Sequence, residues 1–73
     1  MLMAGPAMAA APLKVLYITG GCCHDYTAQA AAISSGLEEW GDMKVTVYQD
    51  PNTTTDSRIK LYEDPAWAAP YDV

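Results

Sequence analysis

Basic side chains are scarce in this chain of 73 residues. Four lysines and arginines stand against nine aspartates and glutamates, which gives a formal net charge of −5 at pH 7. Affinity for nucleic acid comes mainly from clustered lysine and arginine side chains, and anionic membrane surfaces attract the same residues. The composition therefore excludes nucleic acid as a partner and argues against binding to an anionic membrane surface.

Covalent cross-links and long apolar runs are also missing. The two cysteines, Cys22 and Cys23, are adjacent and close no loop. No stretch reaches the ~20 apolar residues that a membrane-spanning helix needs, so we expect no stable membrane span. A chain this short buries only a modest share of its surface, and its stability then depends on partners or on further chain.

The first eleven residues carry no charge and are rich in alanine and methionine. They end in the small-residue patterns Ala7-Met8-Ala9 and Ala9-Ala10-Ala11, which are typical of the end of a secretory signal. A basic segment in front of them is absent, and the apolar run is short. We therefore interpret residues 1–11 as a truncated signal peptide or a disordered leader. The protein is then exported, to the periplasm or the medium.

Hydrophobic periodicity predicts a strand, a helix and a second strand. Residues 15–19 form a continuous apolar run, typical of a strand that is covered on both faces. A helix is expected over residues 27–40, with a buried stripe formed by Ala30, Ile33, Leu37 and Trp40. Residues 44–48 alternate as a second strand. Such a unit has parallel strands joined by a right-handed crossover, which predicts an α/β fold.

Capping residues mark the two ends of the expected helix. Asp25 or Thr27 is placed to accept hydrogen bonds from the free N–H groups of its first turn. Gly41 is placed to end it in the left-handed conformation. After the second expected strand, residues 50–56 have the composition of a polar loop.

The remaining residues predict less regular structure. Asp64-Pro65 favours the start of another short helix, which would carry Trp67 as a buried anchor. Residues 70–73 have the pattern of an entry into a third strand. Two strands and one full helix cannot bury both faces of a doubly wound sheet. We therefore expect residues 12–73 to be the amino-terminal part of a longer domain, whose remainder is needed for folding.

These features together resemble a ThuA-like domain, the family named for trehalose utilisation. The resemblance covers Lys14 to Val73 and rests on Gly20-Gly21 after the first strand, His24-Asp25-Tyr26, Gly36-Leu37-Glu38-Glu39-Trp40, Lys44-Val45-Thr46-Val47, the loop carrying Asp50, and Tyr71-Asp72-Val73. It implies a flavodoxin-like α/β domain, related in fold to class I glutamine amidotransferases but generally without their cysteine triad. It also implies export by bacteria and a role in sugar metabolism, particularly of disaccharides and keto-sugars.

The expected site follows the first strand, because ligands of open α/β sheets bind at the carboxyl ends of the strands. Gly20 and Gly21 allow a ligand close to the backbone, although a turn with positive φ explains them equally well. His24 is a candidate for proton transfer or for holding a divalent metal, against a structural hydrogen bond that ties the turn. Asp25 is a candidate catalytic carboxylate, but a carboxylate before a helix usually caps it.

Cys22 and Cys23 belong to the same expected site. Adjacent cysteines chelate a metal poorly because consecutive side chains diverge, and a disulfide between neighbours closes a strained ring. We interpret both as small, half-buried packing residues beside the ligand. Nucleophilic catalysis by a cysteine with His24 is an alternative.

Three functions agree with these residues. An enzyme would act on a carbohydrate-derived small molecule, with His24 working opposite a residue from a later segment. A non-catalytic module would only bind the carbohydrate in the same crevice. An inactive fragment would expose a strand edge and an apolar face, and would be poorly ordered. Trp67 is a candidate for stacking on a sugar ring, whereas Trp40 is expected to pack in the core.

Overall fold

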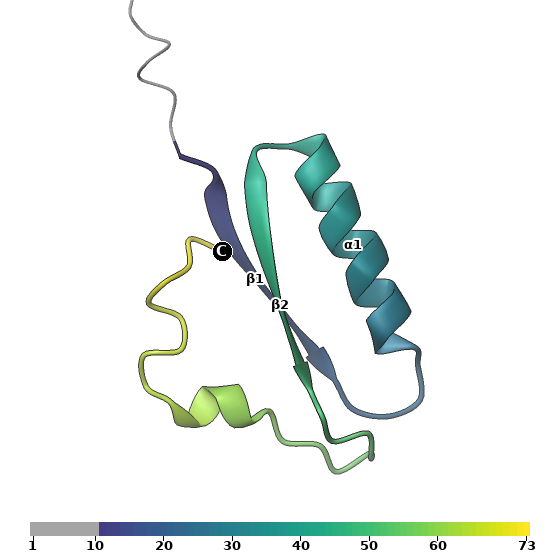
Figure 1. The fold of residues 1–73 in the computed structure, drawn as a ribbon. Coiled ribbons are helices and arrows are strands. Elements are labelled where there is room, and N and C mark those ends of the chain that lie inside the picture. Colours follow the sequence, from purple (N-terminus) through teal and green to yellow (C-terminus); the bar gives the residue numbers. More distant parts are fainter. Residues whose placement is uncertain (1–10) are drawn as a thin grey trace, which may run out of the picture.

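Two parallel strands and one long helix form the frame of the molecule. The computed structural model describes residues 11–73, so the predicted leader lies outside the described part except for Ala11. The elements are β1 (Leu13–Gly20), α1 (Tyr26–Trp40), β2 (Met43–Asp50) and a short 3-10 helix, η2 (Lys60–Glu63) (Figure 1). The predicted α/β unit is confirmed, and each strand is longer than predicted at both ends.

The two strands pair in parallel with one constant register. Leu13 lies opposite Met43 at the start of the sheet, and Gly20 lies opposite Asp50 at its end. Both strands therefore finish at the same edge, which we call the carboxyl edge. The loop of residues 21–25 and the loop of residues 51–59 leave the sheet there.

Helix α1 ends at the expected residue, Trp40, and begins at Tyr26, one residue before its predicted start. The Asp25 carboxylate accepts a hydrogen bond from the Ala28 N–H, at 3.0 Å, as a helix cap does. Gly41 follows the last residue, and its N–H donates to the Leu37 carbonyl. The left-handed conformation predicted for Gly41 is wrong, because its φ of −147° and ψ of 176° are extended. An extended residue leads the chain directly into β2, which starts two residues later.

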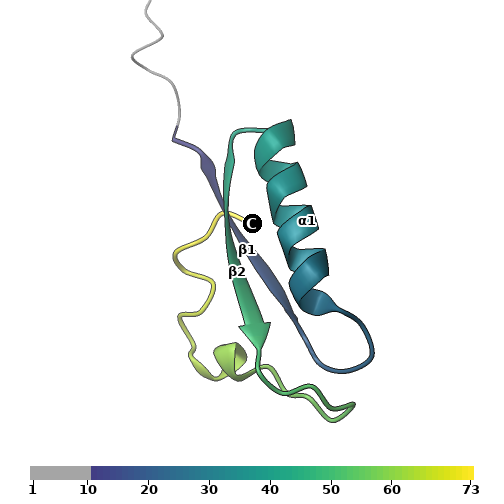
Figure 2. The ribbon, with the colours of Figure 1, turned by 45° about the vertical axis from the view of Figure 1, so that its right-hand side comes forward.

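The buried face of α1 is narrower than the sequence predicts. Ala30 is buried and Leu37 is half-buried, as expected, and Tyr26 and Ser34 complete this face. Trp40, however, is 84% exposed, so its predicted place in the core is wrong, as is that of the exposed Ile33. The reason is the width of the sheet: α1 packs on two strands, mainly on β2, and such a surface covers only one narrow stripe (Figure 2).

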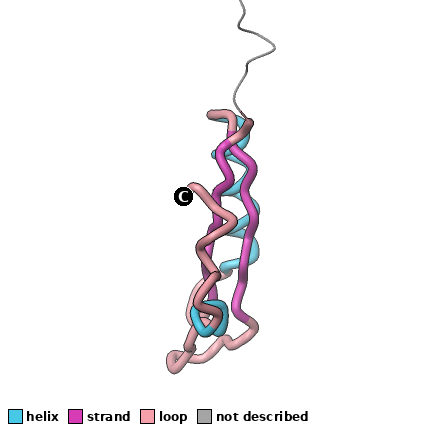
Figure 3. The backbone as a smooth tube through the Cα atoms, turned by 90° about the vertical axis from the view of Figure 1, so that its left-hand side faces the viewer, coloured by secondary structure: helices cyan, strands magenta, loops and turns pink. Residues whose placement is uncertain are grey.

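The sheet lies between α1 and the segment of residues 64–73, which we call the C-terminal segment. Figure 3 shows the helix on one side of the strands and the last loop on the other. Leu16 and Ile18 of β1 face the C-terminal segment. Val15 and Ala30 are the buried apolar side chains of the described chain, so the core is small. Within residues 11–73, no helix is both long and apolar enough to cross a membrane.

The C-terminal segment forms turns where a short helix was predicted. Successive i to i+3 hydrogen bonds link Trp67 to Asp64, Ala69 to Ala66, and Tyr71 to Ala68. The Asp64 carboxylate accepts from the Ala66 N–H, at 2.9 Å, which resembles the cap that was expected. These residues do not form an α-helix, because their hydrogen bonds join residues three apart and not four, and Pro70 has no N–H group to donate.

The last two residues pair with the free edge of β1 without forming a strand. The Val73 N–H donates to the Lys14 carbonyl, at 3.2 Å, and the Val73 carbonyl accepts from the Leu16 N–H, at 2.8 Å. Val73 is thus hydrogen-bonded to both neighbours of Val15, as residues of adjacent parallel strands are. The Asp72 carboxylate also accepts from the Lys14 N–H, at 2.8 Å. The predicted entry into a third strand is thus present only as these contacts.

Candidate functional site

Gly20 shapes the turn that leaves β1. Its φ is 140°, a value that side chains rarely allow, and the next residue, Gly21, has a φ of 99°. A Cβ atom on Gly20 would lie 2.9 Å from the Cβ of Asp50 and 3.0 Å from its backbone nitrogen. Both the backbone conformation and the close approach therefore require glycine here. At Gly21 a Cβ would make only ordinary contacts, so its conformation alone favours glycine.

Asp50 organises the other half of the carboxyl edge. Its side chain is 3% exposed and accepts hydrogen bonds from the Asn52 N–H at 3.1 Å, from the Ser57 hydroxyl at 3.4 Å and from the Lys60 N–H at 3.5 Å. The Gly21 N–H donates to the Asn52 carbonyl and so joins the two loops. Sequence reasoning did not select Asp50 for the site. The available signal was its position after a predicted parallel strand, which places it beside Gly20.

His24 lies exposed on the loop between β1 and α1. Its ring meets the Tyr26 ring edge to face, with 5.8 Å between the ring centres. The Tyr26 hydroxyl donates to the Cys22 carbonyl, at 2.8 Å, and this bond fixes the aromatic ring under the loop. Within residues 11–73 no side chain donates to or accepts from the imidazole. The imidazole is therefore accessible to a ligand and is oriented by an aromatic contact.

The Asp25 carboxylate caps α1 through the Ala28 N–H. One of its oxygens is thus engaged with the helix, and the residue is exposed. Capping accounts for its position in full, and its candidate catalytic role stays a prediction.

The sulfur atoms of Cys22 and Cys23 lie in contact with each other. Cys22 is half-buried, as expected, whereas Cys23 is exposed, and their place beside a ligand stays a prediction. Consecutive side chains diverge in an extended chain. Cys23 has a positive φ of 88°, which removes it from that conformation and allows both sulfurs to lie on one side of the turn.

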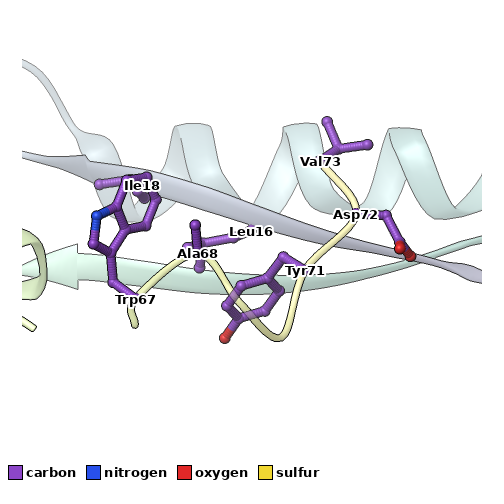
Figure 4. Close-up of a pocket in the computed structure, with 7 residues that line it drawn as sticks. All are labelled: Leu16, Ile18, Trp67, Ala68, Tyr71, Asp72 and Val73. Atoms are coloured by element: carbon purple, nitrogen blue, oxygen red, sulfur yellow. The ribbon is translucent and has the colours of Figure 1, made fainter. Parts of the chain in front are cut away.

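A cavity of about 310 Å³ lies away from this edge, on the face of the sheet opposite α1. Its lining comes from β1 and the C-terminal segment (Figure 4): Leu16, Ile18, Trp67, Ala68, Tyr71, Asp72 and Val73. Trp67 is half-buried and packs edge to face on Tyr62, with ring centres 4.8 Å apart. Trp67, the candidate for stacking on a sugar ring, lines this cavity, whereas Gly20, Gly21, Cys22, Cys23, His24 and Asp25 do not. The alternation of β1, which puts Leu16 and Ile18 on one face, was the signal for it.

In the part of the chain that the structure describes, no group of three or more histidine, cysteine, aspartate or glutamate side chains is placed to hold a metal ion. The divalent metal considered for His24 therefore has no set of companion ligands among residues 11–73. Comparison with protein-family models, curated proteins and solved structures gave no match to this chain.

Proposed function

We propose that this chain supplies the ligand-binding edge of an exported, flavodoxin-like ThuA domain that acts on a carbohydrate-derived small molecule. The observation that carries the proposal is the carboxyl edge itself. There the parallel strands end together, Gly20 and Gly21 turn the chain with positive φ, and the imidazole of His24 is exposed beside Tyr26. Parallel α/β sheets bind small ligands at this position.

A further observation supports the flavodoxin-like part of the proposal. Val73 pairs beside β1 on the edge opposite β2, which gives the spatial order of the first three strands in a flavodoxin-like sheet.

A second candidate function is a binding module without catalysis. The observation in its favour is the cavity on the other face of the sheet, where Trp67 and Tyr71 are the large lining side chains. Aromatic faces stack on the apolar faces of sugar rings, and this cavity contains no histidine. Catalysis at the carboxyl edge and recognition in the cavity use different residues, so the two functions separate by mutation.

The test is a titration of the chain, folded by added trimethylamine N-oxide, with trehalose and with a keto-disaccharide, followed by NMR of the His24 ring. The Trp40→Phe variant adds a second signal, since Trp67 is then the single tryptophan and its fluorescence reports on the cavity. Binding at the carboxyl edge shifts the His24 resonance to saturation, and calorimetry shows that His24→Ala abolishes this binding while Trp67→Ala does not. The binding module gives the reverse pattern. No saturable change at either place, at millimolar sugar, would refute both.

Asp25→Asn separates capping from catalysis. Asparagine is as good a helix cap as aspartate but cannot carry a proton as a carboxylate does. If the sugar is converted, which NMR of the sugar detects over time, unchanged turnover in Asp25→Asn restricts Asp25 to capping. A large loss of turnover with unchanged helix content would assign it to the chemistry.

A further inference from the structure

The edge of β1 that faces away from β2 is paired over only part of its length. Neighbouring residues of a strand in a parallel sheet direct their backbone N–H and C=O groups to opposite edges of that strand. Leu13 donates to the Asp42 carbonyl just before β2, so the residues in step with Leu13 point toward β2. Lys14 and Leu16 point the other way, because the Lys14 carbonyl and the Leu16 N–H pair with Val73.

Past the contact with Val73, this edge offers backbone groups to a further strand. They are the Leu16 carbonyl and the N–H and carbonyl of Ile18, which is in step with Leu16. None of them is directed at β2, and no hydrogen bond with a loop or a side chain of residues 11–73 uses them. We call this stretch the free edge of β1. An unpaired strand edge is a template on which another extended chain can pair.

The contact with Val73 fixes the direction and register of such a strand. A chain that continues this pairing runs parallel to β1, and its successive residues lie opposite Leu16, Tyr17, Ile18 and Thr19. The residue opposite Tyr17 donates to the Leu16 carbonyl and accepts from the Ile18 N–H. The residue opposite Thr19 donates to the Ile18 carbonyl. The two residues between them turn their backbone groups to the outer edge.

The side chains of this strand that lie opposite Leu16 and Ile18 are on the same face of the sheet as the cavity, because those two residues line it. Trp67 and Tyr71 form the facing wall (Figure 4). Asp72 is the charged residue in the lining, and its carboxylate already accepts from a backbone N–H of β1. Aliphatic side chains therefore suit this place. The net charge of −5 disfavours an acidic occupant.

We propose that the free edge of β1 binds an extended peptide segment of a partner protein, uncharged or basic, which runs parallel to β1 and places branched aliphatic side chains in the cavity. In this mode of recognition, main-chain hydrogen bonds give affinity and pockets for alternate side chains give specificity. The proposal goes beyond the proposed function and does not rest on sugar binding. A bound peptide excludes a sugar from the cavity but leaves His24 at the carboxyl edge free.

The first experiment uses a blocked peptide in which valine and threonine alternate, valine first, with one lysine at its end. The matched control has the same composition but begins with threonine, so that hydroxyl groups enter the apolar cavity. The full chain with Trp40→Phe is folded by trimethylamine N-oxide, and Trp67 fluorescence and calorimetry follow the titration. We expect saturable binding of the valine-first peptide, and a dissociation constant about tenfold higher for the control.

The second experiment tests the backbone pairing without changing the protein. An N-methyl group on the second residue of the valine-first peptide removes the donor to the Leu16 carbonyl, whereas the same group on the third residue lies on the outer edge. We expect the first change to weaken binding by about tenfold or more and the second by about twofold or less.

Three results overturn the proposal: no saturable binding of the valine-first peptide, equal affinity of the two methylated peptides, or a preference for the threonine-first control. Sedimentation of the same samples tests a different occupant of the free edge. A dimer of the chain that excess peptide does not dissociate assigns this edge to a second copy, and the peptide is then the wrong partner. A monomer that binds one peptide supports the proposal.

Discussion

Gly20 combines two separate requirements at one backbone position. Its φ of 140° is unfavourable for any side chain, and a Cβ atom would meet the Asp50 backbone nitrogen at 3.0 Å. A backbone atom cannot move aside as the end of a flexible side chain can. We therefore expect Gly20→Ala to destabilise the fold by ~1–3 kcal/mol, the usual cost of a strained backbone conformation.

The measurement is folding driven by trimethylamine N-oxide, which favours the compact state because it is excluded from protein surface. Circular dichroism follows the midpoint, which Gly20→Ala raises. Gly36→Ala is the matched control, since nothing lies within 4 Å of a Cβ at that helical position. It is expected to lower the midpoint, because alanine stabilises a helix interior by about 0.5–1 kcal/mol relative to glycine. Equal midpoints for both variants would contradict the argument.

Asp50 is the second residue on which the carboxyl edge depends. In Asp50→Ala the Asn52 and Lys60 N–H groups and the Ser57 hydroxyl lose their acceptor, and the loop of residues 51–59 loses its anchor. Unpaired, partly buried donors cost about 1–3 kcal/mol. The same osmolyte titration measures the loss. Asp56→Ala removes the same charge from an exposed side chain and should leave the midpoint unchanged; a matching shift there would assign the effect to net charge alone.

At the scale of single residues, the sequence predicted the features that depend on neighbours along the chain. The cap at Asp25 and the glycine turn follow from neighbours along the chain, and the structure confirms the cap. Asp50 was missed because its partners come from a later loop, and only the parallel register brings it against Gly20. The turn at Cys23 was missed because the argument assumed an extended chain there, where φ is in fact positive.

Among the elements, β2 has an outer edge that α1 partly protects. In this register the Val45 N–H points away from β1. It donates a hydrogen bond to the Glu38 carboxylate on α1, at 2.8 Å. Unpaired strand edges invite pairing with other chains, and charged groups on the edge discourage it. We expect Glu38→Ala to weaken folding by about 0.5–1.5 kcal/mol, the usual worth of one hydrogen bond, and to increase self-association.

Light scattering against time, together with the osmolyte midpoint, checks this prediction. Glu39→Ala is the matched control, because it removes an equal charge from the adjacent exposed residue, whose side chain makes no hydrogen bond within the described chain. Only Glu38→Ala should associate faster. If both variants associate at one rate, charge alone protects the edge and the contact with Val45 is irrelevant.

Elements were predicted better than the surfaces they bury. Residues 15–19 and 44–48 lie within the observed strands, and the helix starts one residue before its predicted first residue, because apolar periodicity is a local property. The buried face of α1 depends instead on the width of the sheet beneath it. Two strands offer less surface than the predicted stripe assumes, which leaves Trp40 in solvent.

The whole molecule has little interior to stabilise it. Among the described residues, Val15 and Ala30 are the buried apolar side chains, and no side chain is fully buried. Several large apolar residues are exposed: Leu13, Ile33, Trp40, Val47, Tyr62 and Val73. Fixing the backbone costs ~1–2 kcal/mol per residue, and burial of apolar surface is the main term that offsets it. A three-layer arrangement with so few buried side chains offsets that cost poorly.

We therefore predict that the 73-residue chain in plain buffer shows no cooperative thermal transition, has weak near-ultraviolet circular dichroism, and gains order as trimethylamine N-oxide is added. Calorimetry and near-ultraviolet circular dichroism measure this, and sedimentation at several concentrations establishes whether the chain is monomeric. A sharp heat-absorption peak from a monomer, independent of concentration, would show that two strands and one helix suffice. A peak that appears only as concentration rises would show that a second copy covers the apolar surface. Either a flat trace or this concentration-dependent peak leaves the small interior as the factor that limits the stability of the single chain.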